Sequence, residues 1–278
     1  MGRVNLFVIG VNKAGTSWLY HLLSKHPDIY MSDVKELFFF GTDREGPTNL
    51  KAYHRHFDFN ESHSYYGEAT ATYYREPAVA TEIASYNSNA KLIAIVRDPI
   101  ERTRSHFQYH KQLGIIDEEQ PLQTIFERDP SPYLANSHYE TALPAFRRQF
   151  GRDQFSVVSL EESKANPEAF WSDLLAFLDL SSVPCPDPDA EPENPTGSAS
   201  FRWVYRTIMQ PIKHHVPAFY KWMLQSTAVR QTKLGLLRLL GQAEKEPIPQ
   251  NVKERLRQEF APTYAYLSDL GFESYDSN

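Results

Sequence analysis

Residues 6–19 read LFVIGVNKAGTSWL, and this stretch decides the fold. Its first six residues are almost continuously apolar, as in a strand that is buried on both faces. A glycine-containing loop follows, and apolar residues then recur at helical spacing as far as His26. The stretch therefore predicts a buried strand, a glycine loop and a helix that begins where the loop ends.

The same order of elements recurs twice along the chain. Residues 91–96 read KLIAIV and precede a helix expected over 100–113, and residues 155–160 read FSVVSL and precede a helix expected over 167–178. Strands that alternate with helices indicate a parallel sheet. We therefore predict an α/β fold of three layers, P-loop-like, in which helices flank a central parallel sheet and the carboxyl ends of the strands share one edge.

The composition is that of an ordinary globular protein. The chain has 278 residues, of which 41% are hydrophobic and 23% charged. A formal net charge of −6 argues against a general nucleic-acid binder. The single cysteine, Cys185, excludes a disulfide framework, and no apolar run is long enough to span a bilayer. We therefore expect a cytoplasmic protein without a transmembrane segment.

Charge is distributed unevenly along the chain. Residues 194–243 contain no Asp or Glu but seven Lys or Arg, and they follow a proline-rich acidic connector at 182–195. We interpret residues 200–245 as a helical basic cap or insertion within one domain, residues 1–278. An alternative is an acceptor-side cap that contacts a large apolar substrate or anionic lipid. A closing helix is expected over 252–267.

The loop over residues 10–17 has the chemistry of a phosphate site. A helix N-terminus presents backbone N–H groups and the positive end of the helix dipole to an anion. Lys13 adds a full charge, and Thr16 and Ser17 add hydroxyl groups. Lys13 precedes Gly15, whereas a Walker A sequence places its lysine after the second glycine. A strand–helix turn with an incidental lysine is the alternative interpretation.

Arg97 stands at the end of the second strand, which parallel pairing is expected to bring beside the first loop. Its guanidinium and the hydroxyl of Ser105 on the following helix could bind a second phosphate. Two phosphate sites on one sheet edge predict a nucleotide that is phosphorylated at both ends of its ribose. For Arg102 and Arg104 the alternative is a solvated helix face, which we favour for Arg104.

Together these segments resemble a known family. Residues 13–19 (KAGTSWL) are similar to the 5′-phosphosulfate loop of sulfotransferases that use 3′-phosphoadenylyl sulfate (PAPS), and residues 97–105 (RDPIERTRS) to their 3′-phosphate motif. The resemblance continues through residues 157–161 and 177–180, and it is closer to the heparan-sulfate-type and bacterial members than to the cytosolic enzymes. It implies in-line transfer of a sulfuryl group to a hydroxyl or amine, with 3′,5′-adenosine bisphosphate (PAP) as product.

The resemblance also implies roles for individual residues. Lys13 would contact the 5′-phosphate and stabilise the leaving oxygen. Trp18 would lie against the adenine or, equally, anchor the core. The other implied nucleotide contacts are Ala14, Gly15, Thr16 and Ser17 at the 5′-phosphate, Arg97 and Ser105 at the 3′-phosphate, and Arg202 in a late nucleotide loop.

Glu36 is our choice of general base, because the segment VKELFF resembles the heparan-type segment in which a glutamate precedes two aromatic residues. Glu68 is the reserve candidate. The residue after it is Ala69, where heparan-type enzymes often carry lysine, and this difference counts against an anionic polysaccharide acceptor. His138 and Tyr139 fall where the family has acceptor and nucleotide contacts, although we favour packing roles for both.

Two other functions stay open: a P-loop kinase-like phosphotransferase and a nucleotide-binding module without turnover. The position of Lys13 and the lack of an evident magnesium ligand argue against the first. The presence of Lys13 and Glu36 argues against the second. We expect no metal, because the histidines are not spaced as ligands. The expected acceptor is a small molecule or a glycan-like or lipid-like compound, and the oligomeric state stays open.

Overall fold

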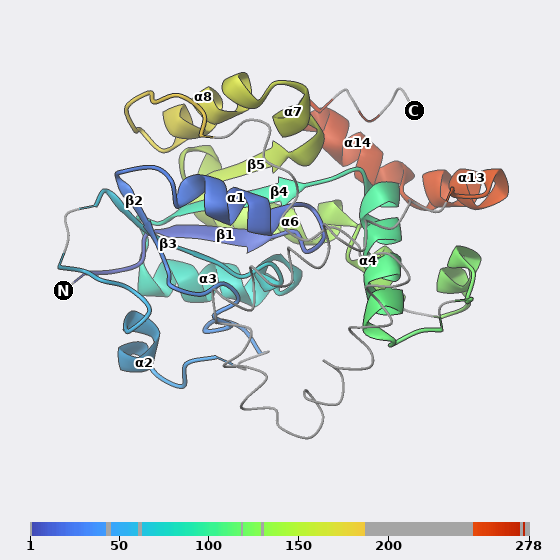
Figure 1. Ribbon diagram of the computed structural model, residues 1–278, viewed down its shortest axis with the longest axis horizontal. Coiled ribbons are helices and arrows are strands. Elements are labelled where there is room, and N and C mark those ends of the chain that lie inside the picture. The colour runs from blue at the N-terminus through green and yellow to red at the C-terminus, as the bar shows by residue number, and fades with distance from the viewer. Residues whose placement is uncertain are drawn as a thin grey trace, which may run out of the picture.

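The computed structural model describes residues 2–42, 46–60, 63–117, 119–128, 131–186, 247–272 and 275. Within them, five parallel strands form one sheet in the order β2-β3-β1-β4-β5 (Figure 1). Their bounds are β1 Leu6–Gly10, β2 Ile29–Met31, β3 Tyr65–Ala69, β4 Lys91–Val96 and β5 Phe155–Ser159.

Helices connect the strands and close the described part of the chain. The α-helices are α1 Thr16–Leu23, α2 Leu50–His54, α3 Pro77–Tyr86, α4 Pro99–Leu113, α5 Pro132–Ala135, α6 Tyr139–Gln154, α7 Leu160–Ala165, α8 Pro167–Phe177, α13 Gln250–Glu259 and α14 Ala261–Asp269. Two short 3₁₀ helices are η1 Tyr73–Arg75 and η2 Leu122–Glu127. Among the described residues, no helix combines the length and apolarity needed to cross a membrane.

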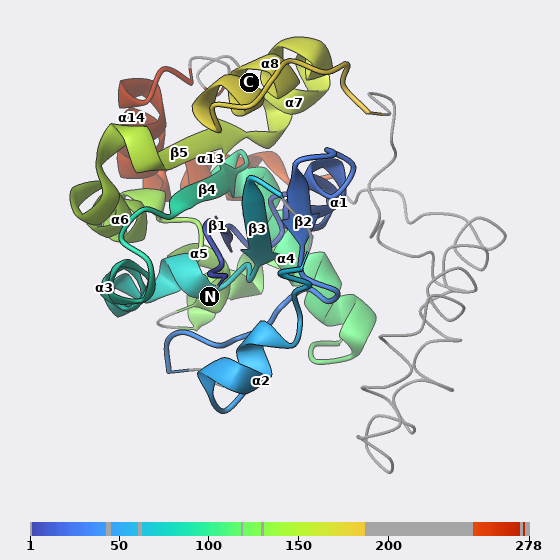
Figure 2. The same cartoon turned by 90° about the vertical axis from the view of Figure 1, so that its left-hand side faces the viewer.

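Helices cover both faces of the sheet. Figure 2 shows α3 and α6 on one side and α1, α7 and α8 on the other. Side chains alternate along β1, so that Leu6 and Val8 join the core beneath α1 and α8, whereas Phe7 and Ile9 join the core beneath α3 and α6. All four are fully buried, which explains the continuous apolar run. The predicted three-layer α/β fold is confirmed.

The expected strands and the helices expected over 100–113 and 167–178 are present, whereas other elements, including the helices α2, α3, α5 and α6, were not predicted. The strands expected at 6–11, 91–96 and 155–160 are β1, β4 and β5, but β2, β3 and α7 were not predicted. β2 has three residues and β3 reads YYGEA, so neither carries an apolar run.

The single closing helix expected over 252–267 is wrong, because α13 ends at Glu259 and α14 begins at Ala261. Pro262 lies in the first turn of α14, and proline has no N–H to continue a helix across that point. The proposed cap over 200–245, Arg202 within it and most of the acidic connector lie outside the described residues.

The sheet order decides where chemistry can occur. β1 lies between β3 and β4, and all three strands run in the same direction. Their carboxyl ends therefore meet at one edge, beyond which α4 stands (Figure 1). The loop after β1, Arg97 after β4 and the residues after β3 are neighbours at this edge, as the sequence predicts for the first two.

Candidate functional site

The loop after β1 turns sharply into α1 at Gly15. Gly15 is the N-cap residue, with φ of 100°, and a Cβ added there would lie 2.8 Å from Cδ1 of Leu160. A side chain at this position is therefore opposed both by backbone strain and by lack of space. Glycine offers no capping side chain, and no side-chain hydrogen bond caps the N-terminus of α1 at Gly15, which is compatible with the predicted phosphate loop over residues 10–17.

Lys13 extends from this loop toward α4. Its Nζ lies 3.9 Å from the centre of the Tyr109 ring, a cation–π contact with a partly exposed tyrosine. Ala14, by contrast, is fully buried and donates its N–H to the Val11 carbonyl at 3.1 Å. Of the predicted loop residues, Ala14 thus shapes the turn, whereas Lys13 carries a charge at the sheet edge.

Lys35 was not among the predicted site residues, yet it reaches the phosphate loop. Its Nζ donates to Ser17 Oγ at 3.0 Å and to Thr16 Oγ1 at 3.3 Å, and it lies 3.5 Å from Glu36 Oε1. One ammonium group therefore joins both loop hydroxyls to the predicted base. The one feature of the sequence that could have indicated Lys35 is its position directly before Glu36. The resemblance pointed to Glu36 and not to Lys35.

Glu36 lies close to the phosphate loop, as its proposed role requires. Its Oε2 accepts the Ala71 N–H at 3.0 Å, and its own N–H donates to the Ala69 carbonyl at 2.9 Å. The side chain is 34% exposed, so the carboxylate can be approached from solvent. The residues that follow β3 thus hold Glu36 by both its backbone and its carboxylate.

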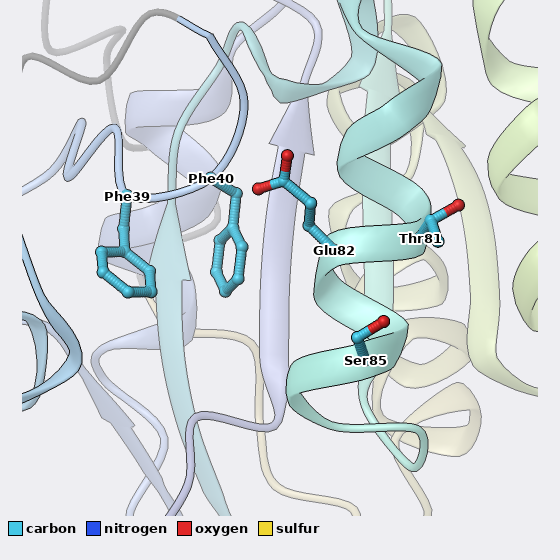
Figure 3. A pocket seen from close by; sticks show the side chains of 5 residues that line it. All are labelled: Phe39, Phe40, Thr81, Glu82 and Ser85. Carbon is cyan, nitrogen blue, oxygen red and sulfur yellow. The ribbon is translucent and has the colours of Figure 1, made fainter.

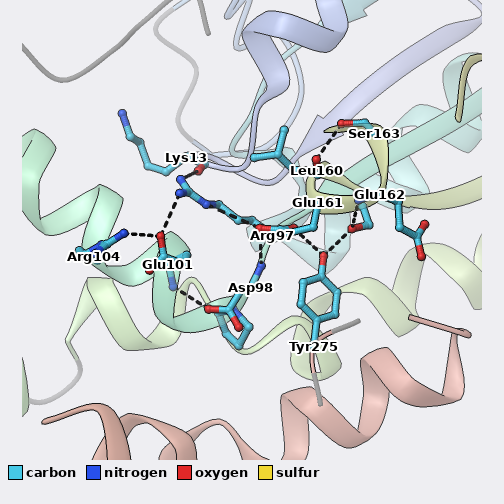
Figure 4. A network of polar contacts seen from close by, with 12 residues as sticks. Lys13, Arg97, Asp98, Glu101, Arg104, Leu160, Glu161, Glu162, Ser163 and Tyr275 are labelled. Atoms are coloured by element: carbon cyan, nitrogen blue, oxygen red, sulfur yellow. Dashed lines mark hydrogen bonds and ion pairs between the residues drawn. The ribbon is translucent and has the colours of Figure 1, made fainter. Parts of the chain in front are cut away.

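Arg97 follows β4 and lies against the phosphate loop. Its Nη1 donates to the Lys13 carbonyl at 3.4 Å, and its Nη2 donates to Glu101 Oε2 at 3.3 Å (Figure 4). Glu161 Oε1 lies 4.0 Å from Nε, which is outside hydrogen-bond distance. In the described part of the chain the buried Nε has no hydrogen-bond acceptor. Arg97 therefore has one N–H group beside the loop that could donate to a ligand.

The other predicted residues of α4 are placed differently. Arg102 is fully buried and donates through Nε to Ser137 Oγ at 2.6 Å. Arg104 is 13% exposed and forms an ion pair with Glu101. The solvated helix face favoured for Arg104 is therefore wrong, because its side chain is mostly buried and pairs with Glu101, one turn earlier on α4. Ser105 follows Arg104 on the same helix and is half-buried.

Glu68, the reserve base, lies on β3 and has no exposed surface. Burial raises the pKa of its carboxyl to about 7, against the lowering effect of hydrogen bonds from Tyr53, Thr70 and Tyr73. A carboxyl enclosed by three hydroxyls does not touch an acceptor that arrives from solvent. The geometry thus favours Glu36 over Glu68 as the acceptor-facing carboxylate.

His138 and Tyr139 have packing roles, as we favoured. The Tyr139 hydroxyl is buried and donates to the Arg97 carbonyl at 2.8 Å, which fixes the backbone after β4. The His138 ring lies between two carboxylates, with Nδ1 2.9 Å from Glu140 and Nε2 3.2 Å from Glu259. These carboxylates raise the pKa of His138, with Glu140 as the main cause.

Trp18 is half-buried, and its ring centre lies 5.5 Å from that of Phe170 on α8. This contact anchors α1 to α8 and leaves part of the indole at the surface, so both interpretations of Trp18 stay open. Within the described residues, no three His, Cys, Asp or Glu side chains are grouped as metal ligands. The expected independence from metal stays a prediction.

A pocket of about 470 Å³ opens between the segment after Glu36 and α3. Figure 3 shows the rings of Phe39 and Phe40 on one side and the α3 side chains on the other, with the Glu82 carboxylate directed toward Phe40. The pocket lining comprises Phe39, Phe40, Thr81, Glu82 and Ser85. Phe39 and Phe40 thus line the pocket on the side of the segment after Glu36.

The model of one protein family, described as the sulfotransferase domain, matches residues 3–192. This match covers β1 to α8 and includes the phosphate loop, Glu36 and Arg97. The chain belongs to the sulfotransferase domain family.

Curated relatives of this sulfotransferase domain are longer proteins. The chain is 34% identical over 126 residues to the membrane-associated sulfotransferase kil1 of Dictyostelium discoideum, a match that covers 44% of this chain and 26% of kil1. It is 27% identical over 184 residues to the human heparan sulfate glucosamine 3-O-sulfotransferase 5, covering 62% of this chain and 52% of that enzyme. The chain thus spans a quarter to about half of the length of these two relatives.

Solved structures show the same architecture. A crystal structure of a sulfotransferase from Alicyclobacillus acidocaldarius superimposes with a TM-score of 0.59 at 25% identity, covering 83% of this chain and all of that one. The sulfotransferase domain from the curacin biosynthetic pathway has a TM-score of 0.51 at 14% identity, covering 94% and 98%, and supports the fold alone.

Proposed function

We propose that this sulfotransferase domain transfers a sulfuryl group from PAPS to a hydroxyl or amine acceptor and releases PAP. The observation that carries the proposal is the contact between Arg97 and the phosphate loop, 3.4 Å from Nη1 to the Lys13 carbonyl. This contact sets a second anion ligand beside the first at one sheet edge. A donor that carries phosphate at both the 5′ and the 3′ position of its ribose matches two such ligands.

The described residues fit this donor. The uncapped N-terminus of α1 offers backbone N–H groups to the 5′-phosphate. The buried Nε of Arg97, which has no hydrogen-bond acceptor among the described residues, offers a donor to the 3′-phosphate, and Ser105 offers a hydroxyl from α4. Buried donors without acceptors are costly, so a bound phosphate oxygen that accepts from Nε would stabilise the complex.

PAPS supplies an activated sulfuryl group bonded to its 5′-phosphate. Lys13 and Lys35 stand on two sides of the phosphate loop, where Lys13 neutralises the charge that develops on the bridging phosphate oxygen as the S–O bond breaks. Lys35, which already contacts Thr16 and Ser17, is placed to neutralise the oxygens of the group in transfer. Charge stabilisation of this kind accounts for most of the rate enhancement in related group transfers.

Glu36 takes the proton of the acceptor as the new S–O or S–N bond forms. Its carboxylate is partly exposed and is held by the Ala71 N–H, so it faces solvent in a fixed orientation. A positioned carboxylate that removes this proton contributes typically about 10²–10⁴-fold to the rate.

The acceptor class follows from the relatives only in part. The 3-O-sulfotransferase 5 is named for its action on heparan sulfate glucosamine. In this chain Ala69, where the heparan-type enzymes often carry lysine, is fully buried and brings no charge to the site. We therefore propose an acceptor with a hydroxyl or amine and without the dense negative charge of heparan sulfate.

Calorimetric titration of the protein with PAP, ADP and ATP, with and without Mg²⁺, tests the donor. Tight binding of PAP that does not depend on magnesium is the expected result. Preference for Mg-ATP would overturn the proposal in favour of a kinase-like phosphotransferase. Sulfuryl transfer from PAPS to a panel of alcohols, amines, sugars and lipids then tests the reaction, with Lys13→Ala and Glu36→Gln as inactive controls.

A further inference from the structure

The segment that begins at Glu36 has an unfavourable backbone conformation. Glu36 has φ of 60° and Phe38 has φ of 49°, values that residues other than glycine rarely adopt. Two such residues so close together persist only where the surroundings hold them. The orientation of the Glu36 carboxylate therefore depends on whatever fixes residues 36–40.

Two buried hydroxyls hold this segment by its backbone. Thr70 Oγ1 accepts the N–H of Leu37 at 3.1 Å. The Tyr73 hydroxyl accepts the N–H of Phe39 at 2.9 Å and that of Phe40 at 3.2 Å. Three anchoring bonds, to the N–H groups of residues 37, 39 and 40, thus come from two side chains that follow β3.

Both hydroxyls donate their own protons to Glu68. Thr70 Oγ1 donates to Glu68 Oε2 at 2.9 Å, and the Tyr73 hydroxyl donates to Oε1 at 3.3 Å. A hydroxyl has one proton and two lone pairs. When each hydroxyl donates its hydrogen bond to the carboxylate, its lone pairs point toward the backbone N–H groups of the segment and can accept hydrogen bonds from them.

We propose that Glu68 is a positioning residue for Glu36: its carboxylate orients the hydroxyls of Thr70 and Tyr73 so that they hold residues 36–40 in the strained conformation. Glu68 is fully buried and acts only through these hydroxyls. The inference rests on the proposed function, because it assumes that Glu36 is the base. It adds a reason why β3, next to β1, carries a carboxylate with no solvent contact at its penultimate residue, Glu68.

The same arrangement makes the anchoring of residues 36–40 by Thr70 and Tyr73 depend on the charge of Glu68. A protonated carboxyl has to donate its proton to one of the hydroxyls around it. When that hydroxyl belongs to Thr70 or Tyr73, its own proton is left facing the backbone N–H groups that it would otherwise accept. The groups that face Glu68 are Tyr53 from α2, Tyr73 from η1 and Thr70, with Tyr86 from α3 and the Glu36 carboxylate further away. None of them is a cation, so none opposes protonation of Glu68 by its charge.

Because burial raises the pKa of Glu68 to about 7, we expect the anchoring of residues 36–40 to weaken progressively as the pH falls through that value. The turnover number of the wild-type protein should therefore fall on the acid side of neutrality. Glu68→Gln places an amide donor where the carboxylate accepted, and so it mimics the protonated state at every pH.

The test compares three variants. Glu68→Gln and Tyr73→Phe each break the chain of bonds from Glu68 to the segment. Tyr53→Phe is the matched control, because the Tyr53 hydroxyl also donates to Glu68, at 2.7 Å, but is not part of the link through Thr70 and Tyr73. Tyr53 and Tyr73 are both buried, and both replacements keep the aromatic ring. Each variant loses the hydrogen bond to Glu68, but only Tyr73→Phe also loses the bonds to the N–H groups of Phe39 and Phe40.

Hydrogen exchange of the amides of residues 36–41, followed by mass spectrometry at one pH, is the first readout. We expect at least about tenfold faster exchange in Glu68→Gln and Tyr73→Phe than in Tyr53→Phe, as for the loss of an anchoring hydrogen bond. In PAPS-dependent transfer, the same two variants should lose at least about tenfold in kcat with unchanged PAP affinity, and Glu68→Gln should flatten the acid limb of the pH profile.

Equal exchange in all three variants would overturn the inference, as would a loss of kcat that merely follows thermal stability. The exchange measurement does not depend on turnover. Faster exchange together with full activity of Glu36→Gln would therefore reject Glu36 as base, which is a failure of the proposed function. Should Glu68→Gln fail to fold, the comparison of Tyr73→Phe with Tyr53→Phe decides alone.

Discussion

Lys35 donates a hydrogen bond to Ser17 at 3.0 Å, across the gap between the segment that carries the candidate base and the loop that would bind the 5′-phosphate. The same ammonium lies 3.5 Å from Glu36. Because the oxygens of Ser17 and Thr16 accept from Lys35, their hydroxyl protons can turn toward an anion. The two halves of the candidate site are therefore joined by one charged group.

Replacing Lys35 with methionine should slow transfer more than it weakens nucleotide binding. The stem of the side chain is kept, but the charge beside the group in transfer is lost, so kcat should fall about 10²-fold, as for one lost donor at a developing charge. Lys51→Met on α2 is the control, since Lys51 is exposed and lies on a different helix. A kcat for Lys35→Met that equals that of Lys51→Met would contradict the role.

Gly15→Ala should impair PAP binding beyond its cost in stability. With φ of 100° the alanine is strained by about 1–2 kcal/mol, and its Cβ meets Leu160. Gly271→Ala is the matched control, because Gly271 has φ of 93° and free space around an added Cβ. Thermal denaturation should show a lower Tm in both variants. Calorimetry should show weaker PAP binding only for Gly15→Ala. Equal PAP affinity in the two variants would argue against a phosphate loop at Gly15.

The parts of the site that could be predicted from sequence are those written in one continuous stretch. The loop with Lys13 and Gly15 follows an apolar strand directly, and Arg97 follows another. Once parallel pairing is assumed, their adjacency follows without further information. In the structure β1 and β4 are parallel neighbours, which is the pairing that this prediction requires.

The parts that could not be predicted depend on contacts between distant segments. β3 was missed because its residues Tyr65–Ala69 lack an apolar run, and with it the burial of Glu68 was missed. Lys35 was missed because its partner Ser17 is 18 residues away, on another element. Arg104 was placed in solvent because helical spacing alone does not show how much of a polar side chain the rest of the fold covers; Arg104 is 13% exposed.

The charge on His138 should stabilise the contact between α6 and α13 on the acidic side of neutrality. Its carboxylate partners, Glu140 first, raise its pKa in the folded protein above the unfolded value of 6.5. This stabilisation is fully present below the unfolded pKa and is lost as the pH rises through the folded pKa. His138→Gln, which keeps polar contacts but removes the charge, should lower Tm most near pH 6 and progressively less toward pH 8.5. A difference in Tm that stays constant over this range would show that the charge contributes nothing.

Arg97 should determine recognition of the 3′-phosphate. Its side chain is 15% exposed, its Nη2 is engaged by Glu101, and its Nε is buried beside the loop without an acceptor in the described residues. Arg97→Lys keeps a positive charge but loses the planar set of donors, so it cannot serve Glu101 and a phosphate in the same way.

The variant should bind PAP about 10- to 100-fold more weakly, as expected for one lost charge-assisted hydrogen bond. Its affinity for 5′-AMP, which lacks the 3′-phosphate, should stay that of the wild type, and calorimetry with both ligands measures the two values on one sample. Equal weakening for PAP and 5′-AMP would mean that Arg97 acts by supporting the Lys13 carbonyl, 3.4 Å from its Nη1, and not by contacting the 3′-phosphate. Because the comparison is between two ligands of one variant, a general loss of stability would affect both equally and would not imitate the expected result.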